Sequence, residues 1–190
     1  MKTLLNKIVV VALFIVTAAS PSLAQTQGSS FFVKIDGIQG ESPADGHKDE
    51  IDVFSFNLGV TQAGGNEVGA GAGAGKSQFQ PVMIYKNVDV ASPALFLACA
   101  TGQRIKKVEL KAARRNGDSG PQEYLTITLT DVIVAGFNDQ SANGDGSQTI
   151  LESISLKYAK IEISYRKQNP DGTLGDPVKA GFDLKANKKI

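Results

Sequence analysis

The string AGAGAGKS, residues 70–77, comes nearer than any other segment of this chain to a chemical motif, that of a phosphate-binding loop. Such a loop needs glycine where Ala70 stands, and later a lysine, which Lys76 supplies. It must also open a helix whose first backbone amides hold the phosphates. Pro81 follows Lys76 closely and would break that helix early. We therefore interpret residues 64–77 as a flexible, glycine-rich connection rather than as a nucleotide site.

A second polar segment, residues 138–147, begins like a calcium-binding loop, with oxygen-bearing side chains at alternate positions from Asp139 onward. A loop of that type ends on a bidentate glutamate at its twelfth position, but this chain has Ile150 there, and Glu152 comes too late. The flanking residues do not have helical patterns. We expect a mobile polar loop, and weak calcium binding by residues 139–145 is an alternative that the sequence leaves open.

His47 is the only histidine and could act as a general base if a nucleophile were framed beside it. The only cysteine, Cys99, lies in an apolar run and is a poor partner for it. The carboxylates of residues 49–52 lack apolar neighbours that would raise their pKa values. The pattern therefore indicates no catalytic constellation, no metal site and no cofactor. We interpret His47 as a residue that organises its loop by hydrogen bonding to a carboxylate or to the backbone.

Strand patterns dominate the chain that must position these groups. Residues 104–115 and 123–134 alternate apolar with polar or β-branched positions, as expected for strands with one buried face. The alternation changes parity after Asp131, and it does so again near Ala159 and Lys160, where we expect a β-bulge or bend. Long strands with bends favour a closed or strongly coiled sheet. The predicted fold class is mainly β, a compact antiparallel β-barrel made of two curved sheets.

One short α-helix is predicted at about residues 92–101, flanking the barrel. Ser92 suits the N-cap position, Pro93 the first helical position, and Gly102 the left-handed position after the last turn. Most of the side chains in this segment are apolar, so the helix should pack on the barrel.

The N-terminus has the pattern of a secretory signal peptide. Lys2 and Lys7 precede an unbroken apolar run at residues 8–16, and residues 22–24 form a small-x-small cleavage signature. We expect cleavage after Ala24 and an exported protein that is periplasmic or secreted. A buried N-terminal helix or strand is the alternative.

After this leader we expect a flexible segment at residues 25–30 and a single domain at residues 31–190, a length that suits one core. No second apolar stretch is long enough to span a bilayer, so no membrane partner is expected once the leader is removed. The formal net charge of the full chain is +1, which gives no electrostatic reason to expect nucleic acid as a partner.

Several short motifs, in order along the chain, resemble those of the Hcp family, the tube proteins of bacterial type VI secretion. The first follows the family's strand–GESxDxxHxxEI–strand pattern, with Asp45 at a slightly different spacing. The others are a D-x-x-S-P-x-L helix start, a strand that begins at Tyr124, an E-x-x-S-L-x-x-x-K-I-x-x-x-Y signature and a C-terminal tail. In this chain the motifs fall at residues 40–51, 88–95, 124–134, 152–165 and 181–188.

This resemblance implies a non-enzymatic structural protein that forms hexameric rings, and these rings stack into a tube that carries or chaperones small effectors. The implied partners are further copies of the chain, secreted effectors and the secretion spike protein. We expect ring-to-ring contact through a loop that contains Gln39, Gly40, Glu41, Ser42, Asp45 and His47. The signal peptide is a departure from the family's pattern. An exported binding module or effector, monomeric or a small oligomer without tube formation, is therefore the alternative.

Overall fold

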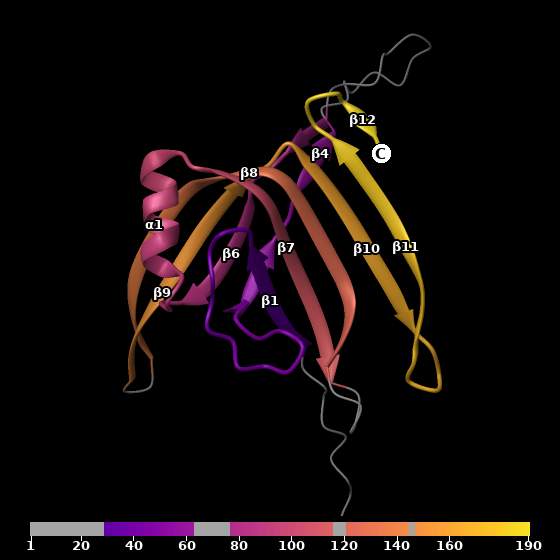
Figure 1. Cartoon of the computed structure of the whole chain (residues 1–190), viewed down its shortest axis with the longest axis horizontal. Coiled ribbons are helices and arrows are strands. Elements are labelled where there is room, and N and C mark those ends of the chain that lie inside the picture. Colours follow the sequence, from indigo (N-terminus) through magenta and orange to yellow (C-terminus); the bar gives the residue numbers. More distant parts are fainter. Residues whose placement is uncertain (1–28, 63–76, 116–120, 145–146) are drawn as a thin grey trace, which may run out of the picture.

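The computed structural model describes residues 29–62, 77–115, 121–144 and 147–190 (Figure 1). The expected signal peptide lies outside these residues, as does all of the glycine-rich segment 64–77 except Ser77. Strands make up most of the described chain, and one helix interrupts them. In chain order the elements are β1 (Ser29–Ile35), β2 (Ile51–Val53), β3 (Ser55–Asn57), β4 (Val60–Gln62), β5 (Ser77–Phe79), β6 (Val82–Asn87), α1 (Ser92–Thr101), β7 (Arg104–Arg115), β8 (Pro121–Gly144), β9 (Ser147–Lys157), β10 (Lys160–Gln168), β11 (Leu174–Asp183) and β12 (Lys188–Lys189).

Ten of the strands form one antiparallel sheet that branches at β8, while β4 and β5 pair separately. The first half of β8 pairs with β7 on one side and β10 on the other, and its second half pairs with β9. One branch runs from β12 through β11, β10, β8, β7 and β1 to β2, and the other continues from β9 through β6 to β3. Because β8 is shared, the two branches face each other across the core.

Asp131 is the residue at which β8 passes from one branch to the other. Its backbone has φ = 56°, in the left-handed region that residues other than glycine rarely adopt. On the partner strand, β9 ends and β10 begins on either side of Ala159, whose N–H donates to the carbonyl of Thr130. Both changes of parity seen in the sequence are thus bends, and the predicted bend at Ala159 and Lys160 is confirmed.

The mainly β, antiparallel architecture with one short helix is confirmed, but the expected closed barrel is wrong. The pairing path ends at β12 on one side and at β2 on the other, and no ladder among the described strands joins these two ends. In Figure 1 the hairpin of β10 and β11 extends the sheet away from the branch that contains β9. Much of β11 is exposed, since this hairpin has no layer to cover it, and Val178 is 73% exposed.

Residues 138–147 were expected to form a mobile loop, but the described ones, 138–144 and Ser147, belong instead to β8 and β9. The ladder runs from Asn138 opposite Ser153 to Gly144 opposite Ser147. The prediction was wrong because main-chain pairing with β9 can hold a polar segment extended whatever its hydropathy. Over the described residues no group of three His, Cys, Asp or Glu side chains lies together, and weak calcium binding at residues 139–145 stays an untested alternative.

The core lies between the two branches and is closed at one end by α1. From the β1–β7–β8–β10 side it contains Val33, Leu110, Leu129 and Ile161, and from the other side Ile84, Ile154 and Leu156. The predicted helix is confirmed, and it buries Leu95 and Ala98 while leaving Phe96 and Leu97 exposed. Gly102 ends it in a left-handed conformation with φ = 67°. The N-cap residue, however, is Ala91 and not Ser92.

Ser92 instead belongs to a buried ionic cluster at the start of α1, where its hydroxyl accepts a hydrogen bond from Lys86. Lys86 is fully buried, and its Nζ donates to Asp89 Oδ1 at 2.7 Å and to Ser92 Oγ at 3.0 Å. Glu152 Oε1 lies 3.0 Å from the same nitrogen, although neither carboxylate oxygen of Glu152 has a well-directed hydrogen bond within the described chain. Asp89 also accepts from the N–H of Ala91. The cluster therefore ties β6, β9 and the turn before α1 together.

Replacing Lys86 with methionine should destabilise the fold by about 3 kcal/mol, because it leaves the buried Glu152 and Asp89 carboxylates without a cation. The measurement is urea unfolding followed by circular dichroism. Adding Glu152→Gln to Lys86→Met should restore part of the loss, since the uncompensated charge is then removed. The control is Lys157→Met at an exposed position of β9. Equal unfolding midpoints for Lys86→Met and Lys157→Met would contradict this account.

Candidate functional site

The β1–β2 loop, residues 36–50, is the segment that was predicted to make assembly contacts. Figure 1 shows it as the purple loop folded back beside β1. Its two arms are joined by hydrogen bonds from Gly40 N to Asp49 O, from Ser42 N to Glu50 O and from Asp49 N to Ser42 O. Asp49 is held in a left-handed conformation with φ = 62°. The loop is therefore a defined structure rather than an open excursion of the chain.

A buried histidine fastens this loop to the sheet. The His47 ring is 2% exposed and stacks on Phe32 of β1, with ring centroids 3.9 Å apart and planes within 6° of parallel. His47 Nδ1–H donates to Glu50 Oε2 at 2.9 Å, because a carboxylate can only accept. Nε2 lies 3.9 Å from Glu123 Oε1 of β8. The interpretation of His47 as a loop-organising residue bonded to a carboxylate is confirmed.

Lys111 of β7 completes the cluster beneath the loop. Its Nζ lies 2.6 Å from Glu50 Oε1 and 3.5 Å from Glu123 Oε1. Burial alone would lower the pKa of Lys111, but the hydrogen bond to Glu50 and the negative charges of Glu123 and Glu50 outweigh it, so this pKa is raised. Stability gained from a raised lysine pKa is complete below its ordinary value and is lost only as the pH rises above it. The Lys111 contacts therefore hold the loop throughout the neutral range.

Gly40 allows the two arms of the loop to approach closely. A Cβ at this position would lie 2.3 Å from the carbonyl oxygen of Glu50, a distance that no side chain tolerates. The buried Ser42 adds a bond inside the loop, since its Oγ accepts from the N–H of Ala44 at 3.3 Å. Glycine and a small hydroxyl residue at these two positions therefore have a structural explanation.

The six residues predicted as an assembly loop fall into two groups. Gly40, Ser42 and His47 are buried and hold the shape of the loop, whereas Gln39, Glu41 and Asp45 are exposed. Glu41 is not entirely free, since its Oε2 accepts from the N–H of Val90 at 3.3 Å, just before α1. The exposed group is the part that another molecule can touch.

The arrangement beneath the loop is a clamp. Within the described residues the side-chain partners of His47 are the Phe32 ring and two carboxylates. Phe32, Lys111 and Glu123 were missed by sequence reasoning. They come from three strands outside the loop, β1, β7 and β8, and no local spacing in the sequence links them to His47.

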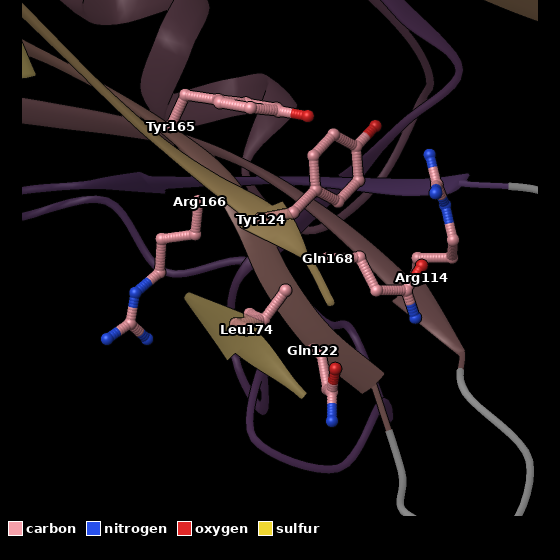
Figure 2. Close-up of a pocket in the computed structure, with 7 residues that line it drawn as sticks. All are labelled: Arg114, Gln122, Tyr124, Tyr165, Arg166, Gln168 and Leu174. Carbon is pink, nitrogen blue, oxygen red and sulfur yellow. The ribbon is translucent and has the colours of Figure 1, made fainter. Parts of the chain in front are cut away.

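Figure 2 shows a separate small pocket at the ends of β7, β8, β10 and β11. The sequence analysis did not predict this pocket. Its volume is about 30 Å³, enough for a group the size of a water molecule or a carboxylate but not for a nucleotide. Arginine, glutamine and tyrosine side chains line most of it, with one leucine. The lining residues are Arg114, Gln122, Tyr124, Tyr165, Arg166, Gln168 and Leu174.

Comparison with known proteins decides the family. The family model described as "Type VI secretion system effector, Hcp" matches residues 32–165. The chain belongs to the Hcp family. Hcp proteins are structural proteins of type VI secretion and are not known as an enzyme family.

Individual Hcp proteins align along most of their length. Protein hcp1 of Pseudomonas aeruginosa PAO1 is 34% identical over 157 residues, which cover 82% of this chain and 95% of that protein. The "Major exported protein" of the same organism is 30% identical over 138 residues, 70% of this chain and 79% of that protein. The crystal structure of Hcp1 from Salmonella typhimurium superposes with a TM-score of 0.70 at 34% identity, covering 85% and 99% of the two chains.

The Hcp family match includes every residue of the β1–β2 loop and its anchors in β1, β7 and β8.

The helix that the structure describes is too short to cross a membrane.

Replacing His47 with alanine should destabilise this Hcp chain by about 2 kcal/mol, because a buried stacked ring and its hydrogen bond are lost together. Urea unfolding of the two proteins measures the difference. The matched control is Lys48→Ala, next to it in the chain but exposed, which should unfold within about 0.5 kcal/mol of the parent. If the two variants unfolded at the same midpoint, the clamp would have no energetic role.

Proposed function

We propose that this chain is a non-enzymatic tube subunit that forms hexameric rings, which stack and carry small secreted effectors. Membership of the Hcp family is the observation that carries this proposal. We further propose that residues 1–24 are a signal peptide cleaved after Ala24, so that assembly takes place in the periplasm or outside the cell. The homologue named "Major exported protein" is consistent with an exported product.

Two exposed apolar areas support ring formation. One is on α1, where Phe96 and Leu97 are 58% and 57% exposed, and the other is on the β10–β11 hairpin, where Tyr165 lies opposite Val178. Figure 1 places α1 and β11 at opposite ends of the long axis of the molecule. A ring requires head-to-tail contacts between two different surfaces of each subunit. We therefore propose that the α1 area of one subunit packs on the β10–β11 area of the next.

The exposed residues of the β1–β2 loop supply the second kind of contact in this proposal, between stacked rings. Gln39 and Asp45 are exposed, their side chains have no partner among the described residues, and the clamp beneath them fixes their position. A contact made by a rigid loop costs less ordering entropy than one made by a mobile segment. Six copies around a ring would multiply a weak contact into a strong one.

Val178→Asp and Leu97→Asp should each convert the hexamer into a monomer, because each places a charge in an apolar contact. Mixing the two variants tests the head-to-tail arrangement. One intact surface from each then remains, so the mixture should form a dimer and nothing larger. Light scattering after size exclusion measures the masses.

The control for these ring variants is Val60→Asp, at a valine of β4 that is as exposed as Leu97, and it should leave the hexamer intact. A hexamer that persists in Val178→Asp, or a mixture that contains only monomers, would overturn the proposed contact.

Combining Gln39→Ala with Asp45→Lys should leave rings intact but abolish their stacking, because the double variant removes one exposed polar side chain and reverses a charge at the proposed ring-to-ring contact. Negative-stain microscopy and light scattering distinguish single rings from tubes. Glu162→Lys, on the exposed side of β10, is the matched control and should still stack. Tubes of unchanged length in the double variant would exclude the loop from stacking.

A further inference from the structure

We propose that the pocket in Figure 2 is a binding site for a carboxylate, and above all for the free C-terminus of a peptide. This binding site is separate from the proposed assembly function, because all seven residues that line it belong to one subunit. The donors and acceptors of the pocket, its size and its charge all favour such a ligand.

The first observation is a pair of arginines without carboxylate partners. Within the described residues no Asp or Glu oxygen forms an ion pair with Arg114 or Arg166, and none of the seven lining residues is acidic. Glu123, which lies between the lining residues Gln122 and Tyr124 in the sequence, instead contacts Lys111 and His47 beneath the β1–β2 loop. The pocket therefore carries positive charge that a carboxylate could neutralise with paired hydrogen bonds.

The second observation is that Arg114 is held in place. Its guanidinium lies 4.9 Å from the centre of the Tyr124 ring, and Tyr124 in turn meets Tyr165 edge to face at 6.4 Å. Tyr124 is the extra residue of a β-bulge, since Ala113 pairs with Glu123 whereas Ala112 pairs with Leu125. The bulge lets Tyr124 turn toward Tyr165 and so places a flat surface beneath the guanidinium.

The third observation is an acceptor with no donor. Gln122 Oε1 is buried and has no hydrogen bond among the described residues, a condition that proteins avoid. A ligand that supplies both a carboxylate for Arg114 and an N–H for Gln122 satisfies both groups. The last residue of a peptide has this combination, because its α-carboxylate follows directly on a backbone N–H.

The size and position of the pocket favour the C-terminal end of a peptide as its ligand. A volume of about 30 Å³ admits a carboxylate but not a large side chain. In Figure 2 Gln168 lies beside Arg114, Gln122 lies at the lower end of the pocket, and the guanidinium of Arg166 points away from the other side chains. We therefore assign Arg114, held over the Tyr124 ring, as the direct ligand, and Arg166 adds charge that attracts the anion.

The test uses three fluorescein-labelled peptides of six residues, made of glycine and serine with a final alanine. One has a free C-terminus, one is amidated, and one is amidated but carries an aspartate as its fifth residue. Fluorescence anisotropy measures their binding to the full chain and to its Leu97→Asp form. The second form keeps the β10–β11 side uncovered, so the test is independent of whether rings form.

The free-acid peptide should bind one or both forms, and amidation should weaken binding about tenfold, as expected for loss of a charge-assisted contact. Arg114→Gln should weaken it by a similar factor, whereas Lys106→Gln, at an exposed cation elsewhere on β7, should not. If the amidated aspartate peptide bound as well as the free acid, the ligand would be a side-chain carboxylate instead of a chain end. Equal binding of all three peptides, or no binding at millimolar concentration, would overturn the site.

Discussion

The left-handed backbone of Asp131 is the constraint on which the rest of the structure depends. It lets one strand, β8, pair with β7 and β10 over its first half and with β9 over its second. An ordinary extended residue at this point would carry β8 straight on and leave the second branch without a partner. The half-buried Asp131 carboxylate accepts hydrogen bonds from Lys185 and from Arg104, and these two bonds lower its pKa. The conformation is thus reinforced from the turn that follows β11 and from β7.

Two ionic clusters, one buried and one partly buried, then fix the parts of the chain that are not in the sheet. Lys86 with Asp89 and Glu152 fixes the entry to α1, and Lys111 with Glu50 and Glu123 fixes the β1–β2 loop. A buried charge cluster is poor evidence of added stability, because desolvation offsets much of the attraction. Its value lies in specificity, since any other placement of the loop or helix would leave charges buried without partners. The bond from Val90 N–H to Glu41 links the two regions directly.

The sequence contained enough to predict what depends on local periodicity. The strands, the helix at residues 92–101 and the bend at Ala159 follow from alternation and capping chemistry, and the ordered motifs indicated the family. The sequence did not contain what depends on partners distant in the chain. The open sheet depends on how far the β10–β11 hairpin extends past its neighbours, and no side-chain pattern records that. In the same way His47 could be interpreted as a loop-organising residue, but Phe32 and Lys111 could not be identified as its anchors.

The residues of the β1–β2 loop divide into a buried group and an exposed group. Gly40, Ser42 and His47 are each held by a specific physical requirement: close backbone approach, a hydrogen bond inside the loop and a stacked ring. Gln39 and Asp45 are exposed and meet no such requirement within the described part of the subunit. Substitutions at the exposed positions should therefore change the surface of the loop without changing where the loop lies. Under the proposed assembly, shape and contact would be carried by different residues of one loop, so the clamp could stay constant while the contact surface varies.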